Sequence, residues 1–314
     1  MAIIRKEAYY TSNNGINKIR ALIWCDDEAQ AIGVVQIAHG VCEHIGRYDE
    51  FARSLVKCGF VVCGNDHLGH GKSVPSLAEL GFVAEGDHVN MLRDMNTLHR
   101  IMAKRYPGVP YIMFGHSMGS FLARIYCAAF PDEIAAAVFC GTTQLPKFAA
   151  ALENPVDYLL SVMPVQTAEK NIPSDIFAKL SRHALKESDD LAWISKSTEN
   201  IENWRNDPMC GFPMSGALTR ELVAMACKAS DAGWAQKLPS DFPVLLISGA
   251  KDSVGFFGKA VIEVADALML AGLDPQVILY PGDRHEILHE DDREKVFSDV
   301  RQFLKEVTDG THGR

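Results

Sequence analysis

The residues whose types and spacing point most clearly to catalysis lie in the pentapeptide Gly115-His116-Ser117-Met118-Gly119. It follows an apolar run, 111–114, and precedes an apolar helical stretch that starts near Phe121. This is the strand, turn and helix context in which a Gly-x-Ser-x-Gly motif indicates a nucleophile elbow. A serine on so tight a turn needs a strained backbone, and glycines two residues before and after it avoid a collision. We therefore predict that Ser117 is a nucleophile.

A serine hydroxyl keeps its proton at neutral pH, so attack on a substrate requires a neighbouring base. In elbow designs an acid and then a histidine follow the serine, each on a loop after a later strand. The β-rich run 242–248 opens into a turn that exposes Asp252, and the run 276–280 ends shortly before His285. We predict that His285 takes the serine proton and returns it to the leaving group, while Asp252 orients the imidazole.

Other acids and histidines compete for these two roles. Asp283 is the serious competitor for the acid, whereas Asp241 precedes its strand and Asp266 lies within a predicted helix. His289 competes for the base because it lies one helical turn later on the same face, and we interpret it as a solvated or capping residue. We therefore favour Asp252 as the acid and His285 as the base.

Backbone amides must stabilise the oxyanion of the tetrahedral intermediate, and each donor is worth about 10²–10³ in rate. One predicted donor is the N–H of Met118, at the start of the helix after the nucleophile. The other should come from the loop after the strand 34–38, which begins His39-Gly40-Val41. Because a glycine lets the chain turn tightly, we predict the amide of Val41 as the second donor of the oxyanion hole.

Several histidines near this loop have an alternative interpretation as metal ligands, namely His39, His44, His67 and His70. They lack a helical His-Glu-x-x-His spacing, and polar side chains in Gly-rich turns commonly bond to the loop backbone. We therefore predict no metal, and we expect Glu43, Arg47 and Asp66 to hold the oxyanion loop through hydrogen bonds and ion pairs. The run 69–71 lacks a phosphate-binding pattern, so no cofactor is expected.

Three segments carry a family resemblance: 39–48, 66–73 and 115–119. Together they resemble the monoacylglycerol lipase and lysophospholipase branch of the α/β-hydrolases, a group of serine aminopeptidase-like hydrolases. The likeness spans most of the chain, although Ser253-Val254 follow the acid where family members often have Pro-Val. The resemblance implies an α/β-hydrolase fold and an intracellular serine hydrolase of monoacylglycerols, lysophospholipids or similar small esters. It also implies that the triad is Ser117, Asp252 and His285.

The elements that must position these residues alternate along the chain. An antiparallel pair is predicted at 3–10 and 18–24, with a further early strand at 60–65. Helices are expected at 48–57, 88–106, 118–130, 258–271 and 291–307. This pattern predicts an α/β fold with a doubly wound, mostly parallel sheet and an active site at the carboxyl ends of the strands.

The length of 314 residues favours one α/β domain with an inserted subdomain. Because the alternation stops after the strand 136–141, we predict a core at 1–143 and 214–314 and a helical cap at 144–213. Candidate substrate contacts in the cap are apolar side chains and one thiol: Phe148, Leu152, Leu159, Met163 and Cys210. Such a surface suits an acyl chain or a transient contact with a micelle or membrane, or else it packs the cap onto the core.

Composition narrows the partners and the compartment. The formal charge of −9 argues against nucleic acid and against strong attraction to anionic lipid. Eight scattered cysteines and a charged N-terminal stretch predict reduced thiols in a cytoplasmic protein without a targeting segment. No stretch approaches the roughly 20 apolar residues that span a bilayer. The expected partner is a small lipid ester.

Two classes of function remain open. One is a serine esterase that acts on small lipids through an acyl-enzyme, and the other is a triad-bearing ligand-binding protein with little turnover. The enzyme is favoured because every catalytic part has a candidate residue. A serine rather than an aspartate at the elbow argues against haloalkane dehalogenase and epoxide hydrolase chemistry. Among esterases, the alternative is a short-acyl or hydroxycinnamoyl carboxylesterase.

Overall fold

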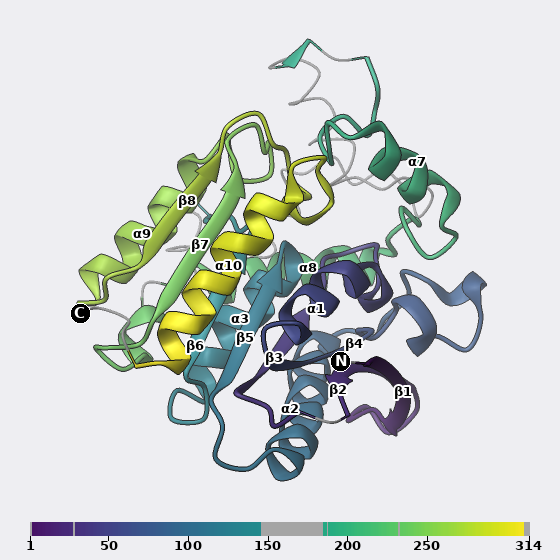
Figure 1. The fold of residues 1–314 in the computed structure, drawn as a ribbon. Helices are drawn as coiled ribbons and strands as arrows, with labels where there is room; N and C mark the ends of the chain where they lie inside the picture. The colour runs from purple at the N-terminus through teal and green to yellow at the C-terminus, as the bar shows by residue number, and fades with distance from the viewer. Residues whose placement is uncertain (1, 28, 146–184, 187, 232, 311–314) are drawn as a thin grey trace.

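An eight-stranded sheet runs through the centre of the molecule (Figure 1). The computed structural model describes residues 2–27, 29–145, 185–186, 188–231 and 233–310. The strands are β1 (Ile3–Thr11), β2 (Lys18–Asp26), β3 (Gly33–Ala38), β4 (Phe60–Asn65), β5 (Tyr111–His116), β6 (Ala136–Cys140), β7 (Val244–Gly249) and β8 (Gln276–Tyr280). They are arranged in the order β1-β2-β4-β3-β5-β6-β7-β8. β1 pairs antiparallel with β2, and β2 with β4, whereas every pairing from β4 to β8 is parallel.

The inner strands are apolar because elements cover both of their faces. Every residue of β3, β5, β6 and β7 is buried. The parallel register pairs Ala38 with Gly115 and His116 with Cys140, so these strands end side by side. The loops that leave this edge of the sheet are therefore brought together, as expected for the carboxyl ends of parallel strands.

Helices cover both faces of the sheet (Figure 1). They are α1 (Asp49–Val56), α2 (Asp87–Arg105), α3 (Met118–Ala129), α7 (Thr198–Asn206), α8 (Gly216–Ala229), α9 (Lys259–Leu270) and α10 (Arg293–Thr308). Short 3₁₀ helices are η1 (Ile45–Tyr48), η2 (Gly71–Ser73), η3 (Leu77–Glu79), η4 (Ala235–Lys237) and η5 (Ile287–His289). One apolar core forms beneath α1 and α10, and a second one forms on the opposite face beneath α2, α3, α8 and α9.

The predicted fold class is confirmed, because the sheet is mostly parallel and helices flank it on both sides. The predicted strands and helices of the core are present close to their predicted ends. The sequence analysis missed α8. Ser215 caps this helix by accepting a hydrogen bond from the N–H of Leu218, and the helix packs against α3.

The predicted cap at 144–213 falls partly outside the described residues, so its boundaries remain a prediction. In the part that is described, α7 lies beyond the edge of the sheet (Figure 1). None of the helices in the described ranges has both the length and the apolar character needed to cross a bilayer.

Candidate active site

Ser117 occupies a sharp turn between β5 and α3. Its backbone is in the left-handed region, with φ at 52°, which is strained for a residue with a side chain. Its N–H donates to the carbonyl of Cys140 at 3.0 Å. A Cβ atom on Gly115 would collide with the carbonyl oxygen of Gly119, and one on Gly119 would collide with that of Ala38. The two glycines thus allow the turn that the elbow motif predicts.

His285 and Asp252 meet at the carboxyl end of the sheet. Asp252 follows β7 and His285 follows β8, and the Nδ1 atom of His285 lies 3.0 Å from Oδ2 of Asp252. Asp252 is fully buried, and its other oxygen accepts the N–H of Val254 at 2.8 Å. Since a carboxylate only accepts, Nδ1 carries a proton and Nε2 of a neutral ring is left as the basic nitrogen.

The competing residues have other partners. Asp283 forms an ion pair with Lys196. His289, which was predicted to be solvated or to cap a helix, is instead half-buried with its ring edge-on to Tyr48. Burial and the charge of Arg47 lower the pKa of His289 to about 4. His289 is thus less exposed than a fully solvated residue, and the alternative that it caps a helix stays a prediction.

A cavity of about 430 Å³ opens beside Ser117 and His285, within the range typical of small-molecule sites. Val41 and Met118, the predicted oxyanion-hole residues, border the same cavity, and so does Cys210. The rest of its wall is mostly apolar, including Phe121, Leu145, Leu191, Trp193, Ile194, Trp204, Leu222, Val223, Ala226 and Val254. The other predicted substrate contacts, Phe148, Leu152, Leu159 and Met163, lie outside the described residues.

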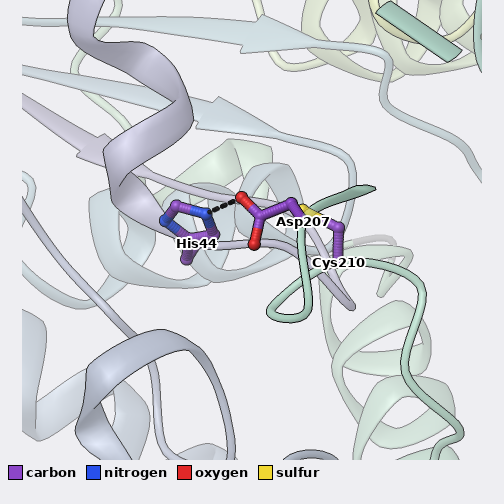
Figure 2. Close-up of side chains that lie close together, drawn as sticks. All are labelled: His44, Asp207 and Cys210. Carbon is purple, nitrogen blue, oxygen red and sulfur yellow. Dashed lines mark hydrogen bonds and ion pairs between the residues drawn. The ribbon is translucent and has the colours of Figure 1, made fainter. Parts of the chain in front are cut away.

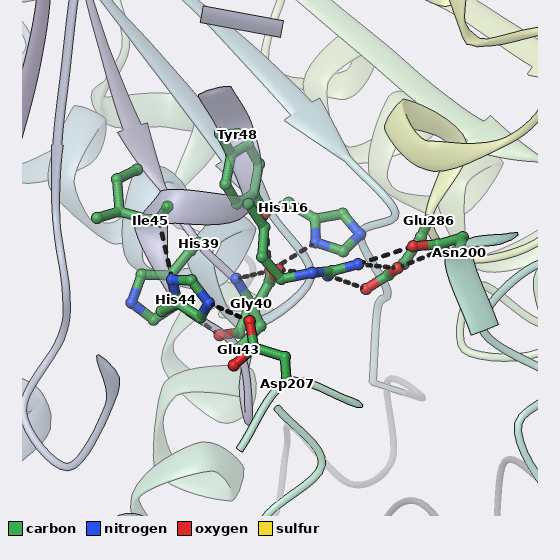
Figure 3. Close-up of polar contacts among 12 residues, drawn as sticks. His39, Gly40, Glu43, His44, Ile45, Tyr48, His116, Asn200, Asp207 and Glu286 are labelled. Carbon is green, nitrogen blue, oxygen red and sulfur yellow. Dashed lines mark hydrogen bonds and ion pairs between the residues drawn. The ribbon is translucent and has the colours of Figure 1, made fainter. Parts of the chain in front are cut away.

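The carboxylate of Glu43 organises the loop that carries Val41 (Figure 3). Its Oε1 accepts the N–H of Gly40 at 2.5 Å and the hydroxyl of Tyr48 at 2.7 Å. A Cβ on Gly40 would come within 3.2 Å of the Ser117 Cβ, so the glycine lets this loop approach the nucleophile. The structural roles predicted for Glu43 and Arg47 are consistent with these contacts, because Arg47 pairs with Glu43 at 2.8 Å. Asp66 similarly accepts the N–H of Ile45 at 2.9 Å.

His116 connects this loop to the candidate base. Its Nδ1 lies 3.2 Å from Oε1 of Glu43, and its Nε2 lies 3.2 Å from the carbonyl oxygen of His285. Burial alone would lower the pKa of His116, but the hydrogen bond and charge of Glu43 outweigh it and raise the pKa above 6.5. Burial would likewise raise the pKa of Glu43, whereas His116 and Arg47 hold it well below 4.5. A protonated His116 can donate from both nitrogens to these two oxygens.

Three further histidines of the predicted loops, His39, His67 and His70, are buried with their rings in tilted or edge-on contact. His39 accepts the N–H of His67 at 3.0 Å through Nε2, and its ring centroid lies 4.2 Å from that of His67. Nδ1 of His39 lies 2.7 Å from the carbonyl oxygen of Gly40. Burial lowers the pKa of His39 and lowers that of His70 to about 3, so these rings are neutral. Their hydrogen bonds belong to the loop backbone, as the structural interpretation predicts.

Among the described residues, one group of side chains has metal-ligand spacing: His44, Asp207 and Cys210, whose candidate ligand atoms lie within 4.8 Å of one another (Figure 2). Nδ1 of His44 accepts the N–H of Gly46 at 3.1 Å, so Nε2 carries the proton and donates to Asp207 at 2.8 Å. A histidine that binds a metal through Nε2 needs the opposite tautomer. Burial also raises the pKa of the Cys210 thiol. The geometry therefore fits a hydrogen bond between two segments and not a metal site.

Comparisons with known proteins identify the family of the chain. Residues 29–292 match the family model Hydrolase_4, described as "Serine aminopeptidase, S33". The chain belongs to this family. It is 28% identical over 302 residues to a monoacylglycerol lipase of Mycolicibacterium smegmatis, covering 92% of this chain and 94% of that protein. It is 26% identical to the human monoglyceride lipase, covering 88% of this chain and 83% of the relative.

Solved structures of similar proteins share the fold. A thermostable carboxyl esterase from Bacillus coagulans, in complex with glycerol, superposes with a TM-score of 0.86 at 29% identity, covering 98% of this chain and 100% of the other. A monoglyceride lipase variant from Saccharomyces cerevisiae superposes with a TM-score of 0.74 at 21% identity, covering 98% and 96%. This family member thus has the α/β-hydrolase fold that its motifs predict.

Sequence analysis missed two acids of the site, Glu286 and Glu290. Glu286 directly follows His285 and pairs with Arg47 at 2.5 Å. Glu290 accepts the Ser195 hydroxyl at 2.7 Å and the N–H of Arg284 at 3.0 Å, so it ties the loop of the candidate base to the segment beside the cavity. Two acids spaced around an apolar pair, Ile287-Leu288, were the available signal, but their partners are distant in the sequence.

Proposed function

We propose that this chain hydrolyses carboxylic esters of small lipids, with monoacylglycerols and lysophospholipids as the substrate class, and that Ser117, His285 and Asp252 form its catalytic triad. The observation that carries the proposal is the position of a strained serine beside an apolar cavity whose wall also includes a histidine bonded to a buried carboxylate. The family and the names of its relatives support the same class of reaction.

The reaction proceeds in two half-reactions. The Ser117 oxygen attacks the ester carbonyl while Nε2 of His285 takes its proton, and the N–H groups of Val41 and Met118 stabilise the oxyanion. The protonated His285 then gives its proton to the leaving alcohol, for example glycerol, and an acyl-enzyme remains. His285 then takes a proton from water as the water oxygen attacks the acyl-enzyme carbonyl. It passes this proton to the departing Ser117 oxygen, so that the fatty acid leaves and the free serine is restored. Asp252 holds the ring in the required tautomer throughout.

The cavity wall determines which acyl groups fit. Side chains such as Leu222, Val223 and Ala226 present an apolar surface from α8, and Trp204 presents one from α7. Burial of an acyl chain against such a surface stabilises the complex by about 0.8 kcal/mol for each methylene group. The cavity therefore favours medium or long acyl chains over acetate.

Initial rates on p-nitrophenyl esters and on monoacylglycerols of graded chain length test the proposal. We expect hydrolysis by the wild-type protein, faster on octanoate or longer esters than on acetate, and none above background by Ser117→Ala. A wild-type protein without esterase activity, or equal rates for both proteins, would show that the chain is a ligand-binding protein or acts on another class of substrate. Faster turnover of acetate would support a short-acyl esterase.

A further inference from the structure

We propose that Arg47 is a positioning residue of the active site. Its guanidinium group fastens the loop that carries His285 to the loop that carries Val41, and it fastens α7 to both. The inference rests on the proposed ester hydrolysis and adds a residue that touches neither the substrate nor the reacting atoms.

The contacts of Arg47 reach three separate segments. One terminal nitrogen, Nη1, donates to Oε2 of Glu43 at 2.8 Å and to Oε1 of Glu286 at 2.5 Å. The other, Nη2, donates to Oε2 of Glu286 at 2.7 Å and to Oδ1 of Asn200 at 2.9 Å. Figure 3 shows Glu43, Glu286 and Asn200 around these bonds. Arg47 therefore makes a two-pronged contact with Glu286, in a geometry that a lysine cannot reproduce.

Two of these acceptors, Glu43 and Glu286, lie directly beside the predicted catalytic groups. Glu43 also accepts the N–H of Gly40, which precedes Val41 in the oxyanion loop. Glu286 directly follows His285, and its own N–H donates to the carbonyl of Ile194, whose side chain borders the cavity. Arg47 thus joins the loop of the base to the oxyanion loop through two carboxylates, beside the bridge that His116 makes between Glu43 and the carbonyl of His285.

The contact with Asn200 connects Arg47 to α7, which contributes to the wall of the cavity. Asn200 lies on α7 and donates from Nδ2 to Glu286 at 2.8 Å, so it bonds both members of the ion pair. The guanidinium carbon of Arg47 also lies 4.7 Å from the ring centre of Trp204, one helical turn later on α7, and Trp204 borders the cavity. Trp204 therefore lies between the cavity and Arg47, in cation–π contact with the guanidinium group.

Burial strengthens the ion pairs of Arg47 with Glu43 and Glu286. The side chain of Arg47 is 9% exposed and those of Glu43 and Glu286 are 2% exposed, so little solvent screens the charges. Removing one partner from such a group leaves the others buried without compensation. Without the guanidinium group, Glu286 loses its cationic partner while Glu43 keeps His116, so the His285 loop loses the side-chain ion pair that joins it to the oxyanion loop.

The test is the kinetic comparison of Arg47→Lys, Glu286→Gln and the double variant on a p-nitrophenyl octanoate substrate. A shift of catalytic groups by about 1 Å lowers rates by about 10²-fold, so we expect kcat to fall about 10-fold or more in each single variant, with KM within about 2-fold of wild type. The double variant should lose little more than either single one, because both remove the same contact. The matched control is Arg301→Lys, which alters an exposed pair with Glu294 at 2.6 Å, and its kcat should equal that of wild type.

Asn200→Ala provides a milder variant if the charge variants fail to fold. It removes the α7 contact alone, and we expect kcat to fall about 3-fold with KM nearly unchanged. Thermal unfolding checks that each variant is folded at the assay temperature. A folded Arg47→Lys or Asn200→Ala with wild-type kcat, or a loss confined to KM, would overturn the positioning role. Absence of hydrolysis by the wild-type protein would instead contradict the proposed function.

Discussion

Oδ2 of Asp252 lies 3.0 Å from Nδ1 of His285, whereas Asp283, two residues before that histidine, is paired with Lys196. Two aspartates thus lie near the base, and only the one after β7 is bonded to its ring in the described structure. We expect Asp252→Asn to lower kcat by about 10⁴-fold, because an amide favours the wrong tautomer of the imidazole. Steady-state kinetics on a soluble ester measure the loss.

Asp283→Asn is the matched control for this substitution. It removes the ion pair with Lys196 and should leave kcat within about 10-fold of wild type, since the carboxylate does not orient the ring. If the two variants lose activity equally, or if Asp283→Asn loses more, Asp252 is not the acid of the triad.

Gly119, two residues after the predicted nucleophile, should not tolerate any side chain. A Cβ on Gly119 would collide with the backbone carbonyls of Ala38 and His39, which cannot move without distorting β3. We expect Gly119→Ala to lower the free energy of unfolding by about 3 kcal/mol or more. In contrast, Gly216 starts α8 with open space around it, so Gly216→Ala should be neutral or slightly stabilising. Urea denaturation distinguishes the two, and equal stabilities would contradict the packing described for the elbow.

Acid should destabilise the fold through the buried histidines. Burial and the neighbouring His39 lower the pKa of His70 to about 3, so the unfolded chain binds a proton that the folded chain excludes. The resulting stability is present above the unfolded pKa of about 6.5 and is lost as the pH falls toward 3. Between pH 7 and 5 this one group accounts for about 2 kcal/mol.

His70→Asn tests this contribution, because asparagine keeps a donor for the carbonyl of Leu68, which Nδ1 of His70 approaches at 2.8 Å. The variant should lose less free energy of unfolding than wild type when the pH is lowered from 7 to 5, whatever its stability at pH 7. Identical losses in urea titrations at the two pH values would show that His70 does not stay neutral in the folded protein.

The size of the cavity should control the preference for chain length. Ala226 on α8 borders the cavity, so Ala226→Phe narrows it without touching the triad. We expect kcat/KM to fall about 10-fold or more for a dodecanoate ester and to change little for an acetate ester. The acetate rate is the internal control, and a uniform loss across chain lengths would show that the acyl chain binds elsewhere.

Much of the core could be predicted from local pattern. The run Phe60–Asn65 is a strand with the bounds expected, because a buried parallel strand is apolar along its length. The helix α8 was missed although Ser215 gives a start signal and Leu218, Leu222 and Met225 follow at helical spacing. It lies between β6 and β7, where the regular alternation of strands and helices along the sequence is interrupted.

The candidate triad could be predicted from the sequence, whereas the ion pair between Arg47 and Glu286 could not. The order serine, acid, histidine is a property of the chain, and each residue follows a recognisable strand. The contact between Arg47 and Glu286 spans 239 positions of sequence, and no periodicity connects them. Long-range ion pairs of this kind emerge only when the loops are folded together.

The first strand also has a consequence for how the protein behaves in concentrated solution. β1 is the outer strand of the sheet, and it contains three consecutive charged residues, Arg5, Lys6 and Glu7, whose side chains alternate between the two faces. Another chain that extended the sheet there would have to pair against these charged residues and remove water from them. The opening hairpin therefore protects this border against edge-to-edge aggregation.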